Sequence, residues 1–282
     1  MLKGQRGSSS PYRPGALLLK VTDEGALFRS PLNGDVILLS PELSVQTQKQ
    51  LGADIIVVMD ELPPLQTGAE ALLASLNRTH EWELRSLASH LEDPRGQAIY
   101  GIVHGGTDPQ LRKLSAEFVS ALPFDGLAVG GSIGGTKGEM LHLLGTLMPA
   151  IRASPAASRP RHLLGIGDPY SLARAVSHGL DTFDSVFPTR AARHGTVYRH
   201  APGHHPPALE SISLRKIDHA DVLEPLDPTC ECPVCAVHST AYLHHLLRSR
   251  EPLFGALATT HNLFVWDRFM SDIRQLIEKD LI

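Results

Sequence analysis

Short apolar runs alternate with longer amphipathic stretches along most of the chain. The runs predict strands at Ile55–Met59, Ala98–Val103, Gly126–Val129, His162–Ile166 and Thr182–Phe187. The stretches predict helices at Ala69–Leu91, Pro109–Leu122, Gly138–Ala153 and Pro169–His178. Strands that alternate with helices predict βαβ units, and therefore a parallel sheet that is buried on both faces.

The ends of several predicted helices carry capping residues. Asp108-Pro109 and Asp168-Pro169 each place a capping carboxylate before a proline at the first helical position. Ser40-Pro41 starts a further helix in the same way, and Gly52 ends it. A helix is also expected near Ser239–Arg250, and a last one runs from about Thr260 to the C-terminus.

Two α/β architectures fit this alternation, a (β/α)8 barrel and an open doubly wound sheet. The apolar runs are too few to close an eight-stranded barrel. Val21–Leu39 is better explained as a hairpin that turns at Leu32-Asn33-Gly34-Asp35. The segment Ala201–Leu223 is rich in Pro, His and polar residues, which predicts loops.

Composition narrows the function classes. The chain has 282 residues, of which 42% are hydrophobic, enough for one large core or a core and a small satellite. Its formal net charge of -4 provides no global attraction to a polyanion, so any nucleic-acid contact needs a local basic patch. No apolar run approaches the ~18 residues that span a bilayer. Residues 1–20 contain lysines and arginines but no acid, which predicts a basic flexible tail and mildly resembles a transit peptide.

The three cysteines form a C-x-C-x-x-C cluster at Cys230, Cys232 and Cys235. This grouping favours a metal site over a disulfide framework. A tetrahedral zinc site needs a fourth ligand, and the nearby candidates are His238, His244, His245 and His261. His261 lies at the start of the last helix, so as the fourth ligand it would connect that helix to the cysteine loop through the metal. Three thiolates and one imidazole leave no open position, so the zinc would be structural.

Several blocks together resemble the tRNA-guanine transglycosylases (queuine tRNA-ribosyltransferases), in order and in spacing, from about Val21 to the C-terminus. The most specific block is Phe183-Asp184-Ser185-Val186-Phe187-Pro188-Thr189-Arg190, followed by Arg193-His194-Gly195. The family's zinc motif matches Cys230, Cys232, Cys235 and His261. The other blocks are Ser40–Glu42, Leu51–Ile56, Met59–Glu61, Gly101–Gly106, Leu127–Gly131 and Leu164–Gly167.

The resemblance implies a (β/α)8 TIM barrel, here incomplete at the N-terminus, with a small zinc-binding subdomain near the C-terminus. The expected parts are a tail over 1–20, the barrel part over 21–222, the zinc-binding subdomain over 223–260 and a C-terminal barrel helix over 261–282. A homodimer, or a heterodimer with a homologous subunit, is implied. The expected location is the cytoplasm, with organelle association left open.

The resemblance also implies a reaction, the exchange of the wobble guanine of tRNA for queuine or a related 7-deazaguanine base. Asp184 is the implied nucleophile, which holds the ribose while one base replaces another. Asp60 reads the N1–H and 2-amino edge of guanine, and the Gly131 N–H reads O6. His104 stands where the family usually has glutamine. Leu164 lies where an apolar side chain packs on the base.

Other positions bear on tRNA binding and on the incoming base. Arg190 and Arg193 follow the nucleophile and are candidates for tRNA phosphate contacts. The residue types at Leu62 and Gly134 resemble those of eukaryotic catalytic subunits, in which the small glycine makes room for the cyclopentenediol of queuine. Thr136 stands where a glutamate is usual, which leaves an aminomethyl contact open.

The sequence departs from the family pattern in one respect, which leaves alternative functions open. The sequence contains no Asp-Ser-Gly-Gly-aromatic-Gln segment, which supplies a general acid/base and a stacking ring in the family. A noncatalytic tRNA-binding or dimerisation subunit, or a truncated isoform, is therefore the alternative to an active pentosyltransferase. An unrelated zinc-stabilised α/β enzyme that binds a phosphate at the Gly130–Gly135 loop is the third hypothesis, and a lone glycine cluster supports it weakly.

Overall fold

The computed structural model of the chain describes residues 17–201, 203 and 207–281. The chain divides into two compact units. The first unit comprises the described residues up to Thr136 together with Thr146–Pro160, and the second comprises Lys137–Gly145 and the residues from Arg161 onward. None of the described helices is long and apolar enough to cross a membrane. Most of the predicted tail over 1–20 lies outside the described residues, and Leu18 already begins the first strand.

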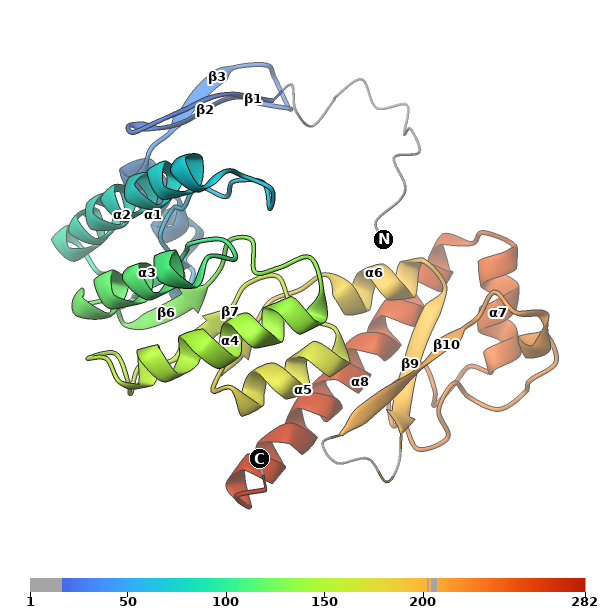
Figure 1. Cartoon of the computed structure of the whole chain (residues 1–282). Coiled ribbons are helices and arrows are strands. Elements are labelled where there is room, and N and C mark those ends of the chain that lie inside the picture. The colour runs from blue at the N-terminus through green and yellow to red at the C-terminus, as the bar shows by residue number, and fades with distance from the viewer. Residues whose placement is uncertain (1–16, 202, 204–206, 282) are drawn as a thin grey trace. The chain divides into compact units, whose positions relative to one another are not determined.

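The first unit opens with an antiparallel three-stranded sheet (Figure 1). Its strands are β1 (Leu18–Thr22), β2 (Gly25–Arg29) and β3 (Val36–Leu39), and the predicted turn connects β2 to β3. Asp23, in the β1–β2 turn, fastens this sheet to a helix. Its carbonyl accepts the Trp82 Nε1–H at 2.8 Å, and its carboxylate pairs with Arg78 at 2.9 Å.

Three parallel strands follow, each with a helix after it. The strands are β4 (Ile55–Val57), β5 (Ala98–Val103) and β6 (Gly126–Val129). The helices are α1 (Pro41–Leu51), α2 (Ala69–Glu92), α3 (Pro109–Ala121) and α4 (Lys137–Arg152), of which α4 continues across the boundary between the units. The Ser40 and Asp108 side chains accept the first free backbone N–H groups of α1 and α3, as their positions before proline predict.

The second unit continues the same alternation. Parallel strands β7 (Arg161–Leu163) and β8 (Thr182–Phe183) are followed by α5 (Pro169–Ser177) and α6 (Phe187–Arg193). The strand predicted over Thr182–Phe187 is thus too long, because Pro188 lies in the first turn of a helix that already begins at Phe187. The α/β class is confirmed, with five strand–helix repeats from β4 to α6.

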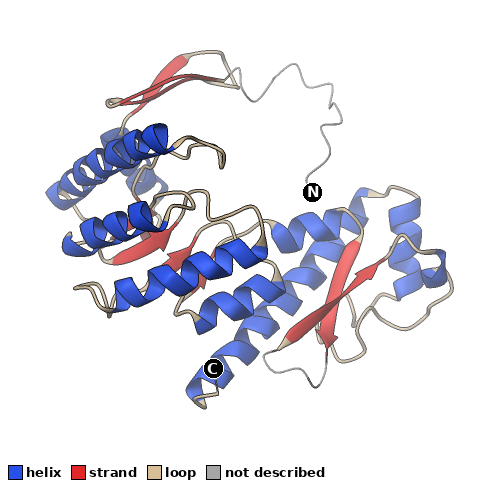
Figure 2. Cartoon of the chain, in the orientation of Figure 1, coloured by secondary structure: helices blue, strands red, loops and turns tan. Residues whose placement is uncertain are grey.

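The rest of the second unit is built around one long helix, α8 (Pro252–Glu278), which contacts α6, α7 (Thr240–Arg248) and strand β9 (Thr196–Ala201) (Figure 2). A short 3-10 turn, η2, spans Ile217–His219. The last helix begins earlier than the expected Thr260, because Pro252 fits its first turn.

The prediction of loops throughout Ala201–Leu223 is wrong for one part. Strand β10 (Ala208–Ser213) pairs antiparallel with β9, and Glu210 lies opposite Arg199 with a 2.9 Å ion pair. This short strand has little apolar alternation of its own. Its pairing with β9 supplies the hydrogen bonds that its sequence pattern does not reveal.

Candidate functional site

A cluster of three cysteines and one histidine is buried in the second unit. Cys230, Cys232, Cys235 and His261 each point one ligand atom at a common centre, and these atoms all lie within 4.8 Å of one another. The His261 Nδ1 atom is 3.4 Å from the sulfurs of Cys232 and Cys235 and 3.8 Å from that of Cys230. Tetrahedral zinc with ordinary bond lengths separates its ligand atoms by about 3.5–3.8 Å, so the four groups fit that ion.

Neighbouring backbone groups hold the ligands in place. The other ring nitrogen of His261 donates to the Tyr198 carbonyl at 2.8 Å, which leaves Nδ1 to face the metal. The backbone N–H of Cys235 donates to the Cys232 sulfur at 3.3 Å. Burial raises the pKa of the Cys230 and Cys235 thiols, so a cation is required to hold them as thiolates. With four protein ligands the site has no position for a substrate, and its role is to tie α8 to the cysteine loop.

A second group of predicted site residues and their neighbours gathers at the carboxyl ends of β4, β5 and β6 in the first unit. Asp60 follows β4, His104 follows β5 directly, and Gly130 and Gly131 follow β6. Gly131 has φ +74°, and a Cβ there would lie 3.3 Å from the His104 ring. The structure therefore brings His104 and Gly131 together. The backbone conformation favours glycine, and a Cβ would also press on the His104 ring.

Arg112, on α3, lies at the centre of this group, and its side chain is almost completely buried. Burial lowers its pKa to about 10, partly offset by Asp60, so the guanidinium remains charged at neutral pH. Burial raises the pKa of Asp60, while its own backbone N–H and the Arg112 charge oppose this. Arg112 thus helps to keep Asp60 in the ionised form that accepts two N–H donors.

The His104 ring is neutral near pH 7. Burial, and then the neighbouring Arg112, lower its pKa to about 4. Its Nδ1 accepts the Gly105 N–H at 2.7 Å, so the proton of the neutral ring is on Nε2. Among the described residues that Nε2 has no hydrogen-bond partner. His104 therefore has one donor, which is buried in this structure, and it lacks the paired donor and acceptor of a glutamine amide.

Asp184 lies at the carboxyl end of β8 in the second unit, and its side chain is 61% exposed. One carboxylate oxygen, Oδ1, accepts both the Gly165 N–H at 2.9 Å and the His162 ring nitrogen Nε2 at 3.1 Å. His162 is itself held by Thr182, with 2.9 Å between Nδ1 and Oγ1. These contacts fix the carboxylate while leaving it open to solvent, as a nucleophile requires.

The remaining predicted residues of the second unit lie close by in sequence. Leu164 follows β7 directly and is half-buried. Arg190 and Arg193 are exposed in the last turn of α6.

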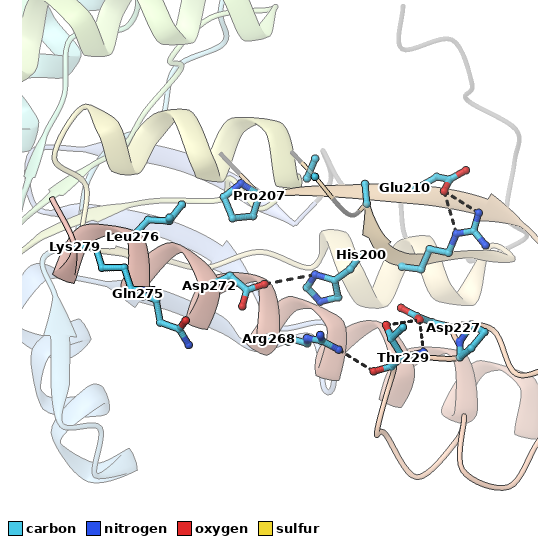
Figure 3. A pocket seen from close by; sticks show the side chains of 15 residues that line it. His200, Pro207, Glu210, Asp227, Thr229, Arg268, Asp272, Gln275, Leu276 and Lys279 are labelled. Carbon is cyan, nitrogen blue, oxygen red and sulfur yellow. Dashed lines mark hydrogen bonds and ion pairs between the residues drawn. The ribbon is translucent and has the colours of Figure 1, made fainter. Parts of the chain in front are cut away.

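Two pockets can be compared with these groups. One of about 380 Å³ lies in the first unit beside the Asp60–Gly131 group, and Gly106 and Ser132 are among its lining residues. Another of about 690 Å³ lies between the β9–β10 hairpin and α8 (Figure 3). There His200 is 3.6 Å from Asp272, and Arg268 donates to the Thr229 carbonyl. None of the predicted site residues is among the described residues that line either of these two pockets.

Comparison with known proteins identifies the family of the chain. The sequence profile of the family described as queuine tRNA-ribosyltransferase matches residues 8–282. The chain belongs to the queuine tRNA-ribosyltransferase family. The queuine tRNA-ribosyltransferase of Protochlamydia amoebophila is 47% identical over 276 residues, which cover 98% of this chain and 68% of that relative. The Chlamydia felis protein of the same name is 42% identical over 279 residues, 99% of this chain and 70% of the relative.

Family membership confirms the resemblance and the zinc site, whose four ligands were all predicted. The relatives named above are bacterial, so the eukaryotic type indicated by Leu62 and Gly134 stays a prediction. Sequence reasoning missed two functional candidates, Arg112 and His162. Arg112 had a signal, because it lies on the buried stripe of α3 together with Ser115, Ala116 and Val119. His162 had none, since its role depends on the pairing of β7 with β8.

Proposed function

We propose that this chain exchanges the wobble guanine of tRNA for queuine, through a covalent bond between Asp184 and the ribose. The observation that carries the proposal is the Asp184 carboxylate, which is oriented by two hydrogen bonds to one oxygen and exposed to solvent. Attack on the anomeric carbon releases guanine, and the incoming base then displaces the carboxylate and restores the glycosidic bond.

Base selection is assigned to the group in the first unit. Asp60 accepts the N1–H and 2-amino protons of guanine, and the Gly131 N–H donates to O6. His104 contributes one further donor from Nε2 once this buried atom becomes accessible to the base. Leu164 packs on the base. Gly134, with φ +120°, and the 64% exposed Leu62 fit the preference for queuine that their residue types indicate.

The fold that we propose for the working enzyme is a (β/α)8 barrel in which Asp60, His104, Gly131, Leu164 and Asp184 all lie at the carboxyl ends of strands, where barrel active sites lie. Arg190 and Arg193 hold tRNA phosphates beside the nucleophile. A homodimer or a heterodimer with a homologous subunit, acting in the cytoplasm, belongs to the same proposal.

The test is the incorporation of labelled guanine into tRNA by the purified chain. Asp184→Asn is the matched variant, because it keeps an oxygen that can accept the Gly165 N–H but cannot form the covalent bond. Loss of exchange in Asp184→Asn, together with a tRNA adduct trapped only by the unaltered chain, supports the proposal. Exchange that continues at the same rate in Asp184→Asn excludes it.

A noncatalytic tRNA-binding subunit is the second candidate, because among the described residues the predicted base-reading residues line neither of the two pockets and the Nε2 atom of His104 is buried. It predicts that the chain retains tRNA through Arg190 and Arg193 but exchanges no guanine by itself. A mixing experiment distinguishes the two candidates. The chain is combined with a full-length relative whose own nucleophile has been replaced. Exchange in this mixture depends on Asp184 only if this chain contributes the nucleophile.

A further inference from the structure

The buried Arg112 side chain connects the two loops that are assigned to base recognition, the β5–α3 loop and the loop after β6. The Arg112 guanidinium donates four hydrogen bonds to carbonyl oxygens. Its acceptors are Gly106 at 2.7 Å from Nε, Val103 and Gly130 each at 2.7 Å from one terminal nitrogen, and Ser132 at 3.2 Å from the other. Two of these carbonyls come from the β5–α3 loop region and two from the loop after β6. A planar fork with five donors is suited to hold several carbonyls at once, which a lysine ammonium is not.

The bond to Gly130 fixes the direction of the next N–H group. The Gly130 carbonyl and the Gly131 N–H belong to one planar trans peptide unit, in which they point in opposite directions. Because the carbonyl points at Arg112, the Gly131 N–H points away from it. The further bond to the Ser132 carbonyl holds the residue on the other side of Gly131. Arg112 thus determines the orientation of the donor that is assigned to O6.

The same helix fixes His104. The Val103 carbonyl accepts from Arg112, and the His104 N–H donates to the Ser115 hydroxyl at 3.0 Å. These two groups again belong to one peptide unit, so α3 holds it from both ends. Arg112 and Ser115 are three residues apart and lie on the same buried face of α3.

We propose that Arg112 and Ser115 are positioning residues for purine recognition, which orient the Gly131 N–H and His104 without touching the base. This inference rests on the proposed function for the identity of the ligand. Since Arg112 acts through Gly131, its loss weakens recognition of the O6 acceptor more than overall purine binding.

The test compares the binding of guanine and 6-thioguanine by calorimetry. 6-Thioguanine keeps N1–H and the 2-amino group but has sulfur, a weaker acceptor, in place of O6. We expect Arg112→Lys to reduce the preference for guanine by roughly two- to tenfold, the usual worth of one hydrogen bond. Arg159→Lys is the matched control, because Arg159 also binds a carbonyl, that of Leu122 at 2.7 Å, but away from these loops.

A preference for guanine that stays unchanged in Arg112→Lys overturns the proposal. Amide hydrogen exchange provides a readout that needs no ligand. Arg112→Lys should speed exchange in both 103–107 and 130–133, and Ser115→Ala, the milder variant, only in 103–107. If the unaltered chain binds neither base, the proposed function fails, and the exchange result alone decides whether α3 positions the loops. Unchanged exchange in both variants refutes the positioning role.

Discussion

Acidification should destabilise the first unit through His104, which is completely buried and neutral in the folded chain. Its pKa falls from 6.5 to about 4 on folding, because burial and Arg112 disfavour the charged ring. The unfolded chain then binds more protons than the folded chain between these two values. Stability is therefore complete above the unfolded pKa and is lost as the pH falls toward the folded pKa.

The magnitude follows from the two pKa values. At pH 5 the unfolded ring is almost fully protonated and the folded ring is mostly neutral, which lowers the free energy of unfolding by about 2 kcal/mol relative to pH 7. We expect His104→Gln, which cannot titrate, to lose about 2 kcal/mol less stability than the unaltered chain between pH 7 and pH 5. Burial also lowers the pKa of His80 to about 4, with a smaller contribution from His104. The burial part is present in both proteins and cancels, so only the smaller coupling between the two rings differs.

The assay is urea unfolding at pH 7 and pH 5, followed by tryptophan fluorescence. The chain has two tryptophans, and a Trp266→Phe background leaves the buried Trp82 to report on the first unit. His142→Gln, at an exposed site, is the control and should leave the pH dependence unchanged. If His104→Gln and the unaltered chain lose the same stability to within about 0.5 kcal/mol, the assignment of a buried neutral ring is wrong.

Four further outcomes are expected. Cys235→Ser should reduce bound zinc, measured by atomic emission, well below one ion per chain and lower the Tm of the second unit, whereas retention of both would exclude a structural role for the metal. His162→Phe should slow exchange by roughly ten- to a hundredfold at unchanged tRNA affinity, because the Asp184 carboxylate loses one of its two tethers; equal rates would show that the tether is unimportant. Gly131→Ala should cost about 1–2 kcal/mol in urea unfolding, because alanine is strained at φ +74°, and a neutral effect would contradict that backbone. Arg193→Gln should reduce the salt dependence of tRNA binding, with a slope smaller by about 0.7–0.9, and an unchanged slope would remove Arg193 from the phosphate contacts.

Much of the secondary structure was predictable because its signals are local. Strands β5 and β6 have the predicted bounds, and α1 and α3 begin at the prolines that follow a capping Ser40 or Asp108. A cap and a proline act within a single turn, so they can be recognised without knowledge of the rest of the fold. The zinc ligands were predicted with help from the family, since spacing alone left four histidines open for the fourth position.

The sequence by itself therefore determined the α/β class, the positions of most helices and strands, the cysteine cluster and the family. The tertiary structure alone decided how the side chains between them are used: that Arg112 binds carbonyls from two loops, that His162 reaches Asp184 across paired strands, and that β10 exists opposite β9. The reason is physical. Periodicity and capping are properties of neighbours in the chain, whereas a buried cation or a paired strand acquires its partners from residues that only folding brings within hydrogen-bond distance.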